Sequence, residues 1–189
     1  GWHPVDTSLH ISDVQSVVDR FGGEKLYGKE PHLALRELLQ NARDAIHACR
    51  RLGYLNDNEG EIEVAVEDAG NGHWLHVTDT GIGMSRYVLT EVLLDFGRSL
   101  WTSRELRGEW AGLAASGFEA IGQFGIGFFS VFMLGIKVKV CTHRYDAKDG
   151  EKQNWLLEFT DGTAQRPLLR EPNGAEKLRR HGTRVSVLL

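Results

Sequence analysis

Three polar residues with complementary chemistry recur at helical spacing: Glu37, Asn41 and Asp44. Residues three and four apart are neighbours on a helix, so their side chains would form one row, with the small Ala45 beside it leaving room for a flat ligand. Two carboxylates and an amide oxygen in a row can hold a hydrated divalent cation and a water molecule. A solvated polar face has the same pattern and is the commoner case, so other motifs must decide between the two interpretations.

A second candidate group begins at Asp79, at the end of a predicted strand. The two-residue period of a strand places Asp79 on the same face as Leu75 and Val77. A carboxylate on an apolar face needs a partner, and it can accept a hydrogen bond from an exocyclic amine such as that of adenine. Gly81 and Gly83 follow, and glycines let the backbone approach a ligand closely. Taken alone, this pattern is usually only a turn.

A third group combines glycines with the start of an apolar helical run. Backbone N–H groups at a glycine-rich helix start can bind an anion, although a turn without a ligand is equally compatible. This segment reads Gly122-Gln123-Phe124-Gly125-Ile126-Gly127-Phe128. Further on, Thr183 shares a strand face with Val185 and Val187, so its hydroxyl could reach the same ligand as Asp79.

These groups need a scaffold of helices and strands. Apolar periodicity, a capping box at Ser12 and Pro31 at a helix start predict helices over residues 14–21, 31–53 and 86–96. Alternation and the hairpin turn Asn71-Gly72 predict strands over residues 61–67 (half-buried), 73–78, 136–143, 155–159 and from 183 onward. Residues 161–181 look like a polar connection, and residues 97–121, rich in small residues, are typical of a lid.

Composition limits the function classes. The chain has 189 residues, 41% of them hydrophobic, and a net charge of -4, which is ordinary for one globular domain and argues against a dedicated nucleic-acid surface. No apolar run is long enough to span a bilayer. Cys49 and Cys141 occupy apolar positions, as reduced core cysteines of a cytoplasmic protein would. The chain starts without Met and stops inside a strand pattern, so we expect a single domain of residues 1–189 excised from a longer protein.

The three groups and Thr183 together resemble the GHKL ATPase superfamily, which includes gyrase-type topoisomerases, histidine kinases, MutL and the ninety-kilodalton heat-shock chaperone. The resemblance runs from about residue 26 to residue 187 and is strongest for the chaperone. It implies the Bergerat fold, an α/β two-layer sandwich in which helices cover one face of a mostly antiparallel mixed sheet. A mobile lid is expected over about residues 94–121.

The resemblance also implies roles for individual residues toward ATP and Mg²⁺. Asn41 would ligate Mg²⁺ on the phosphates, and Glu37 would deprotonate the attacking water. Asp79 would accept from the adenine amine. The remaining binding residues would surround the base or present N–H groups to the phosphates: Asp44, Ala45, Gly81, Gly83, Met84, Thr183, Gly122, Gln123, Phe124, Gly125, Ile126, Gly127 and Phe128.

The sequence departs from the chaperone pattern in places. Glu91-Val92 stands where the chaperones have two asparagines, which puts a sugar contact in doubt, and Arg98-Ser99 replaces a usual Lys-Ser. We expect a divergent chaperone-like ATPase domain that hydrolyses ATP slowly by itself, because in the family a Lys or Arg from a following domain completes the site. Arg98, Arg104 or Arg107 could substitute for that residue. The resemblance is compatible with a homodimer of the full-length protein and specifies no client. A DNA-processing ATPase and a nucleotide-binding scaffold without turnover remain alternatives, and a histidine kinase fits least.

Overall fold

The computed structural model describes residues 30–70, 72–97, 99, 101, 108–122, 125–147 and 154–189. The predicted helix over residues 14–21 lies outside these residues. So do the predicted site residues Gln123 and Phe124 and the three arginines Arg98, Arg104 and Arg107.

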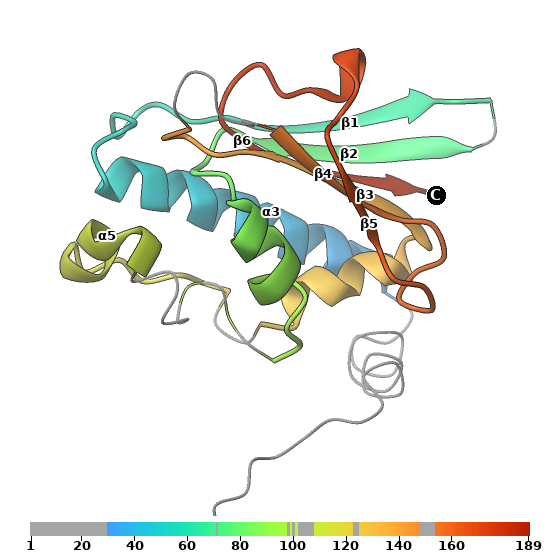
Figure 1. Ribbon diagram of the computed structural model, residues 1–189, viewed down its shortest axis with the longest axis horizontal. Coiled ribbons are helices and arrows are strands. Elements are labelled where there is room, and N and C mark those ends of the chain that lie inside the picture. Colours follow the sequence, from blue (N-terminus) through green and yellow to red (C-terminus); the bar gives the residue numbers. More distant parts are fainter. Residues whose placement is uncertain are drawn as a thin grey trace, which may run out of the picture.

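A six-stranded sheet forms one layer of the molecule, and helices cover one of its faces (Figure 1). Every neighbouring pair of strands in the order β1-β2-β6-β3-β4-β5 is antiparallel. The strands are β1 (Ile62–Asp68), β2 (His73–Asp79), β3 (Lys137–His143), β4 (Asn154–Phe159), β5 (Leu168–Arg170) and β6 (Gly182–Leu188). This two-layer arrangement confirms the predicted fold class.

The long helix α3 (Pro31–Arg51) lies across the inner face of the sheet (Figure 1). Pro31 stands at its first turn, where the missing N–H costs nothing. Its last turn carries Arg50 and Arg51, whose positive charges suit the negative end of the helix dipole. Gly53, with φ of 77°, follows the end of the helix. The helix predicted for residues 31–53 is therefore confirmed.

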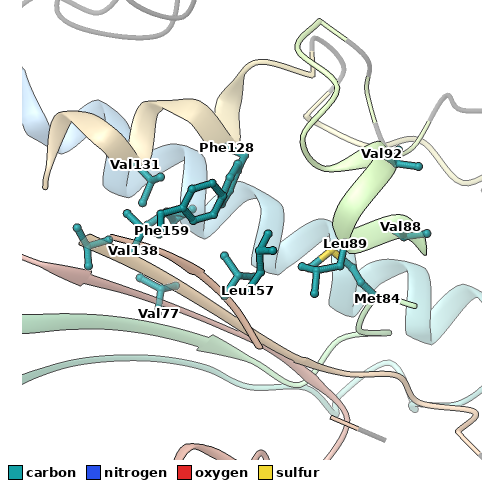
Figure 2. Packing of buried hydrophobic residues seen from close by; sticks show 13 residues of the cluster. Val77, Met84, Val88, Leu89, Val92, Phe128, Val131, Val138, Leu157 and Phe159 are labelled. Atoms are coloured by element: carbon teal, nitrogen blue, oxygen red, sulfur yellow. The ribbon is translucent and has the colours of Figure 1, made fainter. Parts of the chain in front are cut away.

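An apolar core lies between α3 and the sheet (Figure 2). The 3-10 helix η3 (Gly127–Met133) and the π-helix η1 (Val88–Val92) close its two sides. The core members are Leu38, Val77, Met84, Val88, Leu89, Val92, Phe128, Val131, Val138, Val140, Leu157, Phe159 and Val187. Cys49 and Cys141 are free and buried, as predicted.

Two predicted segments differ from the structure. The helix expected over residues 86–96 is helical only through Val92, where η1 ends. The expected polar connection over residues 161–181 contains β5 and a short 3-10 helix, η4 (Gly174–Glu176). β5 pairs with β4, and Arg170 of β5 donates to both oxygens of Glu176, which lowers the pKa of that carboxyl to about 2. Polar side chains thus join β5 to η4, and apolar periodicity does not reveal such a link.

The prediction that residues 61–67 form a half-buried strand is wrong in its burial. The strand exists as β1, but the side chains of Ile62, Val64 and Val66 are 39%, 47% and 64% exposed. β1 is the edge of the sheet, and α3 packs mainly against the neighbouring β2, so the apolar face of β1 remains largely exposed.

Candidate nucleotide site

A cavity of about 570 Å³ lies between α3 and the inner face of the sheet, a size typical of small-molecule sites. It brings together residues from the three sequence groups and Thr183. The predicted residues that line it are Glu37, Asn41, Ala45, Asp79, Gly83, Met84, Gly122, Gly125, Ile126, Gly127, Phe128 and Thr183. Asp44 and Gly81 do not line the cavity, but both contact residues that do.

Asp79 supplies a buried acceptor at one end of the cavity. Its side chain accepts the N–H of Gly81 at 2.8 Å, and the residue is 7% exposed. Burial raises the pKa of the Asp79 carboxyl to about 7, while hydrogen bonds from the backbone N–H groups of Gly81 and Thr183 partly offset that rise. No Lys or Arg of the described chain forms an ion pair with Asp79, so its carboxylate remains available to a hydrogen-bond donor on a ligand.

Two threonine hydroxyls meet beside this acid. Thr142 Oγ1 lies 3.1 Å from Thr183 Oγ1 and accepts the N–H of Met84 at 2.8 Å. It also donates to the carbonyl of Gly182 at 3.2 Å. A hydroxyl has one proton, so Thr183 is then the donor between the two threonines. Thr142 was not among the predicted site residues, and the alternation that puts it on the same strand face as Val138 and Val140 was the only available signal.

The glycines after Asp79 serve contacts within the protein. A Cβ on Gly81 would lie 2.5 Å from the Cβ of Ala45, and Ile82 donates its N–H to the carbonyl of Ala45 at 3.3 Å. Gly83 has φ of 63°, and a Cβ there would collide with the carbonyl of His143. Both glycines thus allow the loop to pack closely against α3 and β3, and Gly83 also lines the cavity. Their contact with a ligand stays a prediction.

The other end of the cavity holds the polar row of α3. A Cβ on Gly127 would lie 2.6 Å from Glu37 Oε2, and a Cβ on Gly122 would lie 3.2 Å from Asn41 Oδ1. The row therefore faces the glycine-rich segment directly. Arg36 donates to Glu37 Oε1 at 3.2 Å, which leaves Oε2 on the side of Gly127.

Asp44, the last member of the row, holds the start of the glycine-rich segment. Its Oδ2 accepts the N–H groups of Ile121 and Gly122, both at 2.9 Å, and the residue is 1% exposed. The carboxylate thus ties the segment to α3 and fixes where the following N–H groups point.

Replacing Asp44 with alanine should lower the free energy of unfolding by about 3 kcal/mol, because two backbone N–H groups lose a buried, charged acceptor. Urea unfolding followed by circular dichroism measures the change. Asp44→Asn keeps an acceptor oxygen and should cost less. Equal stability of wild type and Asp44→Ala would contradict this anchoring role.

Part of the predicted lid covers the C-terminal half of α3. Leu113 of helix α5 (Ala111–Ala115) and Trp110, which precedes this helix, form a second buried cluster with Ala48 and Cys49. Glu109 accepts from Ser85 Oγ at 2.8 Å and pairs with Arg144 at 3.2 Å. These contacts anchor one part of the segment, and the mobility of the lid stays a prediction.

The cavity wall also contains apolar and polar residues that sequence reasoning did not assign to the site. Val77 and Val185 are the inward neighbours of Asp79 and Thr183 on their strands, so strand alternation could have found them. Val92, 1% exposed, contributes an apolar side chain to the cavity wall. The unassigned lining residues are Arg36, Leu38, Gln40, Ala42, Val77, Ile82, Val92, Leu93, Ser99, Trp101, Ile121, Val140 and Val185.

The donor set at the polar end fits Mg²⁺ carried in with phosphates. In the described part of the chain no three His, Cys, Asp or Glu side chains gather into a metal site. Mg²⁺ commonly uses one or two protein oxygens together with substrate phosphates and waters. Asn41, beside Glu37 in the cavity wall, offers such an oxygen.

Among the described helices, none is long and apolar enough to cross a membrane.

Comparison with known proteins identifies this architecture. Residues 29–183 match the family described as "Histidine kinase-, DNA gyrase B-, and HSP90-like ATPase". Heat shock protein 90-5, chloroplastic, of Arabidopsis thaliana is 32% identical over 161 residues, which cover 82% of this chain and 20% of that protein. Chaperone protein HtpG of Rhodospirillum rubrum is 37% identical over 126 residues, covering 64% and 20%. HtpG of Desulfotalea psychrophila is 31% identical over 143 residues, covering 74% and 22%.

The chain spans about a fifth of the length of these curated relatives. The matched region contains α3, the loop after β2, the glycine-rich segment and the start of β6, which are the elements that build the cavity. The chain therefore belongs to the histidine kinase-, DNA gyrase B- and HSP90-like ATPase family, as a domain of the Hsp90- and HtpG-like chaperone type.

Proposed function

We propose that this domain binds Mg-ATP in the cavity between α3 and the sheet and hydrolyses it slowly within a chaperone-like protein. One observation carries the proposal: a single cavity has a buried acceptor, Asp79, at one end and the row of Glu37 and Asn41 at the other. An acceptor for a base amine and a polar row facing N–H groups suit the two ends of a nucleotide.

At the acceptor end, the Asp79 carboxylate would accept from the exocyclic amine of adenine. Gly83 and Thr183 would reach the base through water, and Met84, 8% exposed, would pack against its face. Guanine carries an oxygen where adenine carries this amine, so an ionised Asp79 would repel it. The apolar wall residues, including Val92, exclude water and strengthen the hydrogen bond to Asp79.

At the polar end, backbone N–H groups of residues 122–128 would contact the phosphates. Bound Mg²⁺ would neutralise phosphate charge, with Asn41 as its protein ligand. Glu37 Oε2, which faces Gly127, would orient a water molecule and take its proton.

Turnover also needs a cation on the charge that develops on the phosphates. Arg36 is the cationic residue among the described lining residues, and it already donates to Glu37. We therefore expect the 189-residue chain to bind nucleotide with little hydrolysis, and a Lys or Arg of a following domain to complete the site.

The names of the relatives support a chaperone role for the full-length protein over a DNA-processing one. A homodimer acting on protein clients in the cytoplasm is part of this proposal. The size of the full-length protein, measured by light scattering with and without ATP, tests the dimer.

Calorimetric titration of the chain with ADP, ATP and GTP, with and without Mg²⁺, tests the proposed binding. We expect both adenine nucleotides to bind, more tightly with Mg²⁺, and GTP to bind at least tenfold more weakly. Equal binding of GTP and ATP would contradict the role of Asp79, and no binding of either would contradict the proposal as a whole.

Replacing Asn41 with alanine tests the metal-binding end of the cavity separately from the adenine-binding end. The variant should lose roughly tenfold in affinity for Mg-ADP, the size expected for removal of one hydrogen-bonding or ligating oxygen, while adenosine affinity stays unchanged. Isothermal titration with the two ligands measures both. An equal loss for Mg-ADP and adenosine would argue against Asn41 as the metal ligand.

Adenosine affinity should depend on pH through Asp79. The pKa of this carboxyl in the free protein is about 7, and its ionised form is much the stronger acceptor for the adenine amine. Affinity is therefore complete well above pH 7 and falls as the pH drops through 7, roughly tenfold between pH 8 and pH 6. Adenosine is the better ligand here because it has no phosphate that titrates in this range. A flat profile from pH 8 to pH 6 would count against this acceptor.

A further inference from the structure

The edge strand β1 is exposed to an unusual degree on both faces. Ile62, Val64 and Val66 point to the same face as the buried Val77 of β2, yet their exposure rises from 39% to 64% along the strand. Soluble proteins seldom leave three consecutive inward β-branched side chains of one strand in solvent, and such a row marks an interaction site.

Within the described residues, the backbone of the same three residues also has no partner strand. Thr80 donates its N–H to the carbonyl of Glu61, and Ala69 donates to the carbonyl of Gly72. Antiparallel partners alternate between bonded and non-bonded pairs, so the odd-numbered residues of β1 bond to β2. The N–H and C=O groups of Ile62, Val64 and Val66 consequently face the open edge, on the residues that carry the exposed apolar side chains.

Charge on the opposite face of β1 is entirely negative. Glu61, Glu63 and Glu67 alternate with the apolar residues and share the outer face with Ala65. In the described part of the chain Glu61 and Glu63 form no ion pair, and Glu67 approaches His76 at 3.4 Å. Edge strands are commonly protected by Lys, Pro or a bulge, and β1 has none of these between Ile62 and Asp68.

We propose that β1 is a docking edge for an extended segment of a partner protein, which adds to the sheet as a seventh strand. The segment alternates β-branched or other apolar residues, which cover Ile62, Val64 and Val66, with Lys or Arg residues opposite the glutamates. Backbone hydrogen bonds supply the affinity of such strand addition, and alternate side chains supply its specificity.

Charge argues for a basic partner over a second copy of this chain. Antiparallel pairing of β1 with itself over all seven residues places Ile62 opposite Asp68 and Glu63 opposite Glu67. Two-fold symmetry repeats each pair, so carboxylates face each other twice, and like charges directly opposite destabilise a strand pair.

The probe is a fluorescein-labelled eight-residue peptide that alternates valine with lysine and threonine, and its control carries glutamate in place of lysine. Fluorescence anisotropy measures binding to the 189-residue chain. Val64→Pro removes an N–H that faces solvent, which an edge strand tolerates, and should weaken binding at least tenfold. Glu63→Lys should weaken it at least tenfold as well, while Glu119→Lys, the same charge change at an exposed site elsewhere, should leave it unchanged.

Amide hydrogen exchange gives a readout specific to strand addition. We expect the amides of Ile62, Val64 and Val66 to exchange fast in the free protein and slowly with the peptide, whereas those of Glu63 and Ala65 are slow in both states. The proposal is overturned if the wild type fails to bind the basic peptide, if Val64→Pro binds equally well, or if the glutamate peptide binds as tightly. It is also overturned if the three edge amides are already protected in the free protein, or if Val64→Pro converts a dimer to a monomer.

Discussion

Substituting asparagine for Asp79 is expected to raise the dissociation constant for ADP at least about 100-fold at pH 8, since a charge-assisted acceptor is replaced by a neutral amide. The amide can also turn its NH₂ group toward the adenine amine, which places two donors together. Isothermal titration with ADP measures the loss.

The fold should survive this change. The amide oxygen introduced by Asp79→Asn needs no charge to accept the N–H of Gly81, the contact that the carboxylate makes at 2.8 Å. Burial raises the pKa of the Asp79 carboxyl from 3.8 to about 7, so ionising this group lowers the free energy of unfolding. The decrease develops as the pH rises through this range. The full cost is present at pH 8, so the asparagine variant should be at least as stable there. The exposed Asp57→Asn serves as control. Unchanged ADP binding by a folded Asp79→Asn protein would refute the adenine assignment.

Glu37→Ala in the full-length protein should reduce the rate of ATP hydrolysis by about 10²- to 10⁴-fold, the range for loss of a general base. ADP affinity should stay the same, because Glu37 would contact the attacking water and not the bound product. Phosphate release under single-turnover conditions separates the chemical step from product release.

A second variant distinguishes the role of Glu37 as a general base from its hydrogen bond with Arg36. Glu37→Gln keeps an acceptor for Arg36, which bonds to Glu37 at 3.2 Å, but cannot take a proton. We expect Glu37→Gln and Glu37→Ala to lose hydrolysis alike. Normal turnover in both variants would remove Glu37 from the mechanism, and loss confined to Glu37→Ala would shift the role to the contact with Arg36.

The sequence predicted α3 and the inward side chains of β2, β3 and β6 because local periodicity sets them. Pro31 and Gly53 bracket the helix, and Asp79 follows from the alternation of its strand. It could not predict that β1 is an edge, because burial depends on which strand α3 covers. Nor could it give β5 and η4, which the Arg170–Glu176 ion pair joins across six residues.

The same distinction between local pattern and tertiary structure applies to the candidate site. Residue types and spacing identified which groups belong together, but their contacts depend on tertiary structure. The Asp44 carboxylate bonds to residues 121–122, 77 and 78 positions away, and Thr142 meets Thr183 across neighbouring strands. Gly81 illustrates the limit best, because its small size serves the close approach of Ala45, a residue on another element.

Trp101 gives this cavity a built-in optical reporter. Its indole lines the cavity wall and lies 5.2 Å from the ring of Phe118, while Trp110 is buried at 3% exposure in the adjoining cluster. An aromatic base arriving beside Trp101 would quench or shift its emission, whereas Trp110 would stay constant as an internal reference. Occupancy could then be followed in real time by intrinsic fluorescence, without labelling either the protein or the nucleotide.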